Sequence, residues 1–273
     1  MMITISINPV AFHIGTYEVR WYGIIVALAV AAIILWVWRQ LRGKWAELPK
    51  PPDPIVIVFA ILSGAVVAKL FHVIDRWDIY SQNPGQVFSG GGLSIYGAVI
   101  GTSLFFLIYS KVRHYPFGFF ADLAAPGIIL AQAIGRIGCT INGCCYGEVC
   151  EVAPSWLPGS IVYTHPNSYA PLGVPLVPTQ PYEIIFCLIV FAILLRLRRR
   201  LKPDGTLFLI YLTAYSAWRV GIDFLRVGTP FVLGLHEAQF ISIIVLAVTI
   251  PILALRMWRS RQQAKLGVEK VDV

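Results

Sequence analysis

Charged residues are scarce in this sequence. Of its 273 residues, 13% are Asp, Glu, Lys or Arg, whereas 57% are hydrophobic. A soluble globular domain usually carries about a quarter of its residues as charges. This shortage argues against an ordinary water-soluble domain and predicts a protein whose main solvent is lipid.

Several common motifs are also missing. The sequence has no H-E-x-x-H metal motif, no G-x-S-x-G elbow and no P-loop, so the usual hydrolase and nucleotide-binding functions lack support. It has no visible internal repeat, which disfavours a transporter built from inverted repeats. The first residues, MMITISINPVAFHIG, lack a basic start, a long apolar run and a small-residue cleavage site. We therefore expect no cleaved signal peptide there, and no cofactor or metal.

What the sequence has instead is a series of long apolar runs. A helix needs roughly 20 apolar residues to cross a bilayer core about 30 Å thick. We predict an all-α polytopic membrane protein of about seven transmembrane helices with a small irregular cap on the exterior, periplasmic side. The runs are residues 22–38, 55–74, 93–110, 117–137, 182–195, 206–224 and 238–257.

We expect a single membrane domain over residues 1–273. Its longest stretch outside the predicted helices, 138–181, is rich in proline, which excludes long helices there. This stretch is therefore predicted to be an exterior insertion between the fourth and fifth helices.

The net charge of +8 raises the question of a nucleic-acid partner. The basic residues gather after the first, third, fifth and seventh runs, which an odd number of crossings places on one side of the membrane. The positive-inside rule makes that side cytoplasmic. We therefore predict an exterior N-terminus, a cytoplasmic C-terminus and no nucleic-acid partner.

Arg136 lies in the segment AQAIGRIGCTINGCCYG, near the end of the fourth run. A charge at membrane depth costs a few kcal/mol on insertion scales, so it calls for a functional explanation. One interpretation is an arginine that snorkels to the interface. The other is an arginine that meets an anionic ligand.

A second group of charges lies in the sixth run. Arg219, Asp223 and Arg226 are spaced four and three residues apart and so share one helix face. They form either an internal salt bridge or part of an anion site. With Arg136 they suit a lipid phosphate, because the planar guanidinium grips phosphate oxygens with paired hydrogen bonds. Lys69 and Glu183 are weaker members of the same set.

The third run opens with SGGGLSIYGAVIG. Gly97 and Gly101 form a small-xxx-small pattern, which favours close helix packing. Tyr96 either belongs to the aromatic belt at the interface or donates a hydrogen bond to a ligand.

Four cysteines follow Arg136 closely: Cys139, Cys144, Cys145 and Cys150. Their spacing matches no zinc pattern of paired Cys-x-x-Cys ligands. We expect either a structural disulfide, which an exterior location favours, or inert packing residues.

These motifs together resemble the prolipoprotein diacylglyceryl transferase family. The resemblance rests on GRIGxxxNGxxYG (135–147), GGLSIYGAVIG (91–101), RWYG (20–23), PTQPYE (178–183), YSAWRVGIDFLR (215–226) and EAQFIS (237–242). It covers nearly the whole chain, with matching order and spacing.

The resemblance implies an enzyme of the bacterial plasma membrane. Such an enzyme transfers a diacylglyceryl group from phosphatidylglycerol to the lipobox cysteine thiol of a preprolipoprotein and releases glycerol phosphate. The implied partners are phosphatidylglycerol, the lipobox peptide and the lipid bilayer.

The family motifs imply catalytic roles for Arg136, Arg219 and Tyr96. The implied substrate-binding residues are Arg136, Arg226, Tyr22, Asn142, Gly147, Gln180, Tyr182, Glu183, Tyr215 and Asp223. Many members have histidine where Tyr96 stands, asparagine where Cys139 stands and an acidic residue where Cys144 stands. These departures leave the general base unassigned. They also motivate the alternative of an inactive paralogue that binds lipid or another anion.

Overall fold

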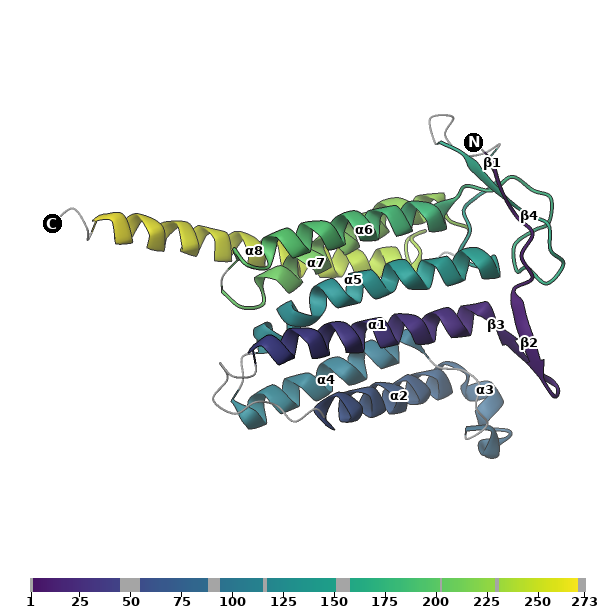
Figure 1. Cartoon of the computed structure of the whole chain (residues 1–273), viewed down its shortest axis with the longest axis horizontal. Coiled ribbons are helices and arrows are strands. Elements are labelled where there is room, and N and C mark those ends of the chain that lie inside the picture. Colours follow the sequence, from purple (N-terminus) through teal and green to yellow (C-terminus); the bar gives the residue numbers. More distant parts are fainter. Residues whose placement is uncertain are drawn as a thin grey trace. The chain divides into compact units, whose positions relative to one another are not determined.

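The computed structural model is mostly helical (Figure 1). It describes residues 2–44, 55–87, 94–114, 117–150, 158–201, 203–228 and 231–269. The chain divides into two compact units, one of Met1–Val37 with Ala121–Val273 and the other of Trp38–Phe120. The sequence-based expectation of a single domain stays a prediction.

A helix forms over each of the predicted apolar runs. The long helices of the described residues are α1 (Trp21–Lys44), α2 (Ile55–Asp75), α4 (Ile95–Arg113), α5 (Phe117–Asn142), α6 (Thr179–Leu197), α7 (Thr206–Ile222) and α8 (Glu237–Glu269). Shorter turns are α3 (Trp77–Tyr80), η2 (Pro84–Val87) and η3 (Asp223–Leu225). By length and composition, α1, α2, α5, α6 and α8 are suited to cross a membrane.

The outward faces of these helices carry large apolar side chains. Leu28 and Leu35 of α1, and Ile244 and Val248 of α8, are each at least half exposed. In water, such continuous apolar surface is costly and rare on a monomer. In a bilayer the same side chains are solvated by lipid, so the protein is a polytopic membrane protein.

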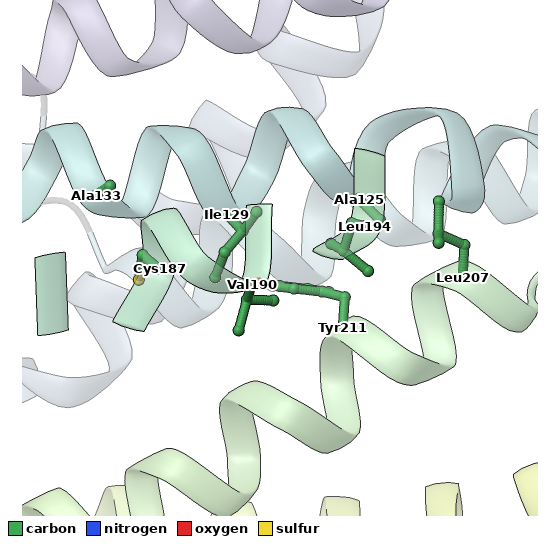
Figure 2. Close-up of a cluster of buried hydrophobic side chains, with 8 residues drawn as sticks. All are labelled: Ala125, Ile129, Ala133, Cys187, Val190, Leu194, Leu207 and Tyr211. Carbon is green, nitrogen blue, oxygen red and sulfur yellow. The ribbon is translucent and has the colours of Figure 1, made fainter. Parts of the chain in front are cut away.

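A buried cluster joins α5, α6 and α7 in the first unit (Figure 2). Its members are Ala125, Ile129, Ala133, Cys187, Val190, Leu194, Leu207 and Tyr211. Small residues on α5 face larger ones on α6 and α7, which lets the helices approach closely. This packing fixes the three helices that carry the charged residues described below.

Helix α1 packs on α5 through glycines. A Cβ atom added at Gly127 would lie 2.7 Å from Cδ1 of Trp36, and one at Gly138 would lie 3.3 Å from Cδ2 of Tyr22. The Trp36 indole also donates a hydrogen bond to the carbonyl of Leu123, at 3.0 Å. Aromatic rings of α1 therefore fill the space that these glycines leave open.

Four short strands accompany the helices, which the all-α prediction did not include. β1 (Met2–Ile5) pairs in parallel with β4 (Ser160–Tyr163), and β2 (Val10–Ile14) forms a hairpin with β3 (Tyr17–Arg20). β1 and β4 lie at the end of the first unit where α5 ends and α6 begins (Figure 1). A four-residue strand has little periodicity, and its partner is distant in sequence, so local pattern could not reveal the pair.

In the second unit, α2 packs against α4. A Cβ atom at Gly97 would lie 2.6 Å from the Val67 carbonyl oxygen, and one at Gly101 would lie 2.6 Å from that of Ser63. Any larger residue would push the two backbones apart. The predicted packing role of these two glycines is confirmed.

Candidate functional site

Charged residues from three helices meet at one end of the first unit. Successive helices run in opposite directions, so the last turns of α5, the first turn of α6 and the end of α7 share that end. Arg136, Glu183 and Arg219 occupy these positions. Side chains that are far apart in the sequence therefore face one another.

Glu183 bridges two arginines. Its Oε1 lies 2.8 Å from Nη2 of Arg136, and its Oε2 lies 3.8 Å from Nη1 of Arg219. The Tyr215 hydroxyl donates to Oε1 at 3.3 Å. One carboxylate thus ties α5, α6 and α7 together.

The network continues along α7 and η3. Arg219 Nη2 lies 2.9 Å from both carboxylate oxygens of Asp223, and Arg226 Nη1 lies 3.4 Å from Oδ1 of the same residue. The predicted ladder is confirmed as one anion between two cations. With Arg136 and Glu183, the network holds three arginines and two carboxylates, a net charge of +1.

These charges are buried. The side chains of Glu183 and Asp223 are 2% and 3% exposed, and those of the three arginines 11% to 17%. Buried ions need partners to offset their desolvation, and each arginine here contacts a carboxylate, although the network as a whole keeps one positive charge in excess. Nη1 of Arg219 is buried and makes no hydrogen bond within the described part of the chain. It faces Oε2 of Glu183 as an ion pair at 3.8 Å, which is longer than a hydrogen bond.

Gln180 belongs to the wall beside this network. It is 1% exposed, and its Nε2 donates to the carbonyl of Cys144 at 2.9 Å and to the hydroxyl of Tyr163 at 3.2 Å. Burial raises the pKa of Tyr163, which keeps its hydroxyl protonated. Gln180 therefore fastens the chain that follows α5 to the start of α6.

Asn142, the last residue of α5, is held by Arg20, which the sequence analysis did not assign to the site. Nη1 of Arg20 donates to Oδ1 of Asn142 and to the carbonyl of Asn167, each at 3.3 Å. The Arg20 guanidinium also lies 4.3 Å from the centre of the Tyr169 ring. Arg20 belongs to the RWYG motif, and this motif is the sequence feature that could have indicated its role.

Gly147 lies where backbones cross. It pairs with Arg226 in an isolated β-bridge, and an added Cβ would lie 2.7 Å from the carbonyl oxygen of Leu225. No side chain fits there. Gly147 therefore positions Arg226 through its backbone alone.

The other predicted residues contact different parts of the chain. Tyr22 packs on Gly138, and the Tyr182 hydroxyl donates to the carbonyl of Pro158. Tyr96 lies in α4 of the second unit, and its side chain is outside the described residues. Nζ of Lys69, also in the second unit, lies 3.4 Å from the Tyr80 hydroxyl.

Helix α5 extends five residues beyond its predicted end, to Asn142, and Gly143 then adopts a left-handed φ of +70° that stops the helix. Arg136 therefore lies within the continuous helix, in the last turns before Asn142. Its Nη1 lies 3.7 Å from Sγ of Cys139, one turn further along.

The cysteines form no disulfide. All five are described and each is a free thiol, which contradicts the disulfide expectation. The sulfurs of Cys139, Cys144 and Cys145 lie within 4.8 Å of one another. Hydrogen bonds from Cys139 and Cys144, helped by the charges of Arg226 and Arg136, lower the pKa of Cys145. Sequence spacing did not predict this group, because it depends on the turn after α5.

Comparison with known proteins identifies relatives over nearly the whole chain. The family model described as prolipoprotein diacylglyceryl transferase matches residues 9–255. A protein of Dehalococcoides mccartyi named phosphatidylglycerol–prolipoprotein diacylglyceryl transferase is 47% identical over 266 residues, covering 97% of this chain and 100% of its own. A protein of the same name from Bacillus licheniformis is 35% identical, over 94% of this chain and 95% of its own. The chain therefore belongs to the prolipoprotein diacylglyceryl transferase family.

Proposed function

We propose that this protein transfers the diacylglyceryl group of phosphatidylglycerol to the lipobox cysteine thiol of preprolipoproteins. The proposal rests on family membership together with one observation, the buried network of three arginines and two carboxylates. Its net positive charge suits a phosphate, as does Nη1 of Arg219, which makes no hydrogen bond within the described part of the chain.

The chemistry requires charge stabilisation. The peptide thiolate attacks the glyceryl carbon that carries the phosphate ester, a C–S bond forms, and the C–O bond to phosphate breaks. The bonding electrons leave on glycerol phosphate. Fixed guanidinium groups in a site of low polarity stabilise that departing anion without reorganising.

The network suggests a division of roles. Arg136 and Arg219 contact the phosphate directly, while Arg226 adds charge through Asp223. Glu183, Asp223 and Tyr215 hold the guanidinium groups in place. Gln180, Asn142 and Gly147 shape the wall, and Tyr22 and Tyr182 line the approach of the substrates.

We further propose that all seven long helices cross the bacterial cell membrane. The N-terminus and the cap of residues 138–181 then lie outside, and the basic clusters face the cytoplasm. Phosphatidylglycerol enters from the bilayer and the lipobox peptide from the exterior leaflet.

The decisive experiment mixes the purified protein with phosphatidylglycerol and a lipobox peptide. We expect a peptide whose mass increases by one diacylglyceryl group on its cysteine, measured by mass spectrometry. A peptide with the cysteine replaced by serine is the control and stays unmodified. No thioether under conditions where a known family member is active would contradict the proposal.

The second candidate is an inactive lipid-binding paralogue, favoured by Tyr96, Cys139 and Cys144 at positions where many members differ. It predicts that labelled phosphatidylglycerol binds to the protein, whereas no thioether forms. The same mixture therefore separates the two functions.

A further inference from the structure

The three sulfurs beside Arg136 form a compact group. Cys139 lies on the last turns of α5 and is buried, whereas Cys144 and Cys145 follow the helix and are partly exposed. All three Sγ atoms lie within 4.8 Å of one another. Within the ranges that the structure describes, no other set of three His, Cys, Asp or Glu side chains meets so closely.

The backbone that presents these sulfurs is held in an unusual conformation. Cys145 has a φ of +61°, a left-handed value that costs a residue with a side chain about 1 kcal/mol or more. The turn is fastened on three sides. The amide of Cys144 donates to the Cys139 carbonyl at 3.2 Å, Gln180 donates to the Cys144 carbonyl at 2.9 Å, and the Thr179 hydroxyl donates to the Cys145 carbonyl at 3.0 Å.

Thr179 and Gln180 are themselves buried in the first turn of α6. The positions of the sulfurs are therefore set by the surrounding fold rather than by the sulfurs' own weak hydrogen bonds. Strained backbone that is maintained by its neighbours is common at functional sites.

The spacing suits a soft cation. Zinc binds thiolate sulfur at about 2.3 Å in tetrahedral geometry, which places its sulfurs roughly 3.8 Å apart. The observed group needs to contract by about 1 Å at most to reach that geometry. A disulfide would need two sulfurs at about 2 Å and would leave the third unused.

Charge favours the same occupant. Three thiolates and one Zn²⁺ carry a net charge of −1, and the Arg136 guanidinium, which also pairs with Glu183, lies 3.7 Å from Cys139 Sγ. Three protein ligands leave the fourth position open, as in catalytic rather than structural zinc sites. The partial exposure of Cys144 and Cys145 gives that position access from outside.

We infer that Cys139, Cys144 and Cys145 form a three-thiolate site for Zn²⁺ whose open fourth position binds the thiol of the lipobox cysteine. Metal binding stands on the geometry alone, whereas the role toward the peptide rests on the proposed function. The site would activate the lipobox thiol. Tyr96 is poorly suited to do so as a general base, since a phenol has a pKa near 10.

The step balances without a redox partner. On binding Zn²⁺ the peptide thiol loses its proton to water, because a metal-coordinated thiol is deprotonated. The thiolate sulfur forms the C–S bond, and the C–O bond to phosphate breaks with its electrons leaving on glycerol phosphate. The thioether product is neutral, so it binds the cation less tightly and leaves.

Cobalt(II) tests the site without relying on activity. Full-length protein, purified in detergent and freed of metal under reducing conditions, is titrated with Co²⁺. We expect one Co²⁺ per chain, with the sulfur-to-cobalt charge-transfer absorption and the visible bands of tetrahedral cobalt, both lost when Zn²⁺ is added. Absence of these bands would overturn the metal site. So would a count of three free thiols instead of five in denatured protein that was purified without reductant, because it would indicate a disulfide.

Variants locate the ligands. Alanine or serine at Cys139, Cys144 or Cys145 should each remove the charge-transfer band, whereas Cys150→Ala and Cys187→Ala, which change cysteines outside the group, should retain it. The melting temperature of each variant shows whether it has folded. If the folded variants of Cys139, Cys144 and Cys145 all retain the full charge-transfer band, the assignment of these residues as ligands is wrong.

Activity then tests the role. Zn²⁺-loaded protein should form the thioether at least about 10-fold faster than metal-free protein, and the lipobox peptide should shift the cobalt bands. Equal rates would overturn the activating role. Bands without any thioether in either form would instead contradict the proposed function, while the metal site stands.

Discussion

Glu183 is the residue that holds the charged network together. It accepts contacts from Arg136, Arg219 and Tyr215, and it is almost fully buried. From the sequence, Glu183 was predicted to be only a weaker member of the set of charges around Arg136. The spacing of Arg136, Glu183 and Arg219 does not show that they meet. Only the antiparallel packing of three helices brings them together.

We predict that Glu183→Gln lowers the free energy of unfolding by about 3 to 5 kcal/mol, because it leaves buried arginines without their anion. Thermal unfolding in detergent measures the loss. Tyr215→Phe is the matched control, since it removes one hydrogen bond from the same carboxylate and should cost only about 1 kcal/mol. Equal losses in the two variants would show that Glu183 acts as an ordinary hydrogen-bonding residue.

Arg136→Ala should lower the rate of thioether formation at least about 100-fold, as expected when one preorganised donor to a developing anion is lost. The variant should still insert into membranes, because the lost group stabilises charge in the reaction. Arg259→Ala, an exposed change near the end of α8, is the control. Unchanged activity in Arg136→Ala would make it a snorkelling arginine.

Tyr96 gives a further test at residue scale. If its hydroxyl orients phosphate or thiol, Tyr96→Phe should slow the reaction at least about 10-fold, and Tyr96→His should be tolerated. Rates of the three proteins with the same peptide decide the matter. A normal rate for the phenylalanine variant would place Tyr96 in the aromatic belt.

At the scale of elements, the glycines between α2 and α4 set how closely these helices approach. We predict that Gly101→Leu destabilises the protein by at least about 2 kcal/mol, because its side chain would overlap Ser63 and Val67. Gly23→Ala is the helical control, since nothing lies within 4 Å of its added Cβ. It should be neutral or slightly stabilising. The comparison uses thermal unfolding of both variants.

The helices themselves could be predicted because length and apolarity decide where a chain can cross lipid. Their ends could not be predicted as well. The end of α5 depends on Gly143 in a left-handed turn, and the start of α6 on the packing of Thr179 and Gln180 against the preceding loop. The group of three sulfurs follows from those ends, which explains why spacing alone missed it.

For the whole molecule, the distribution of basic residues predicts the orientation. A fluorescent protein fused after residue 273 should be fluorescent, and alkaline phosphatase fused there should be inactive, if the C-terminus faces the cytoplasm as we propose. An epitope inserted after Gly173, in an exposed loop, should bind antibody in intact spheroplasts. An active phosphatase fusion together with a hidden epitope would reverse the proposed topology.

The parallel pairing of β1 with β4 carries a consequence for biogenesis. Residue 2 pairs with residue 160, so the first strand has no partner until more than half of the chain has left the ribosome. Contacts so distant in sequence form slowly, because they close a long loop. The amino-terminal strand therefore stays unpaired while the helices between β1 and β4 are synthesised. The turn with Cys144 and Cys145 therefore acquires the residues that surround it only late in synthesis.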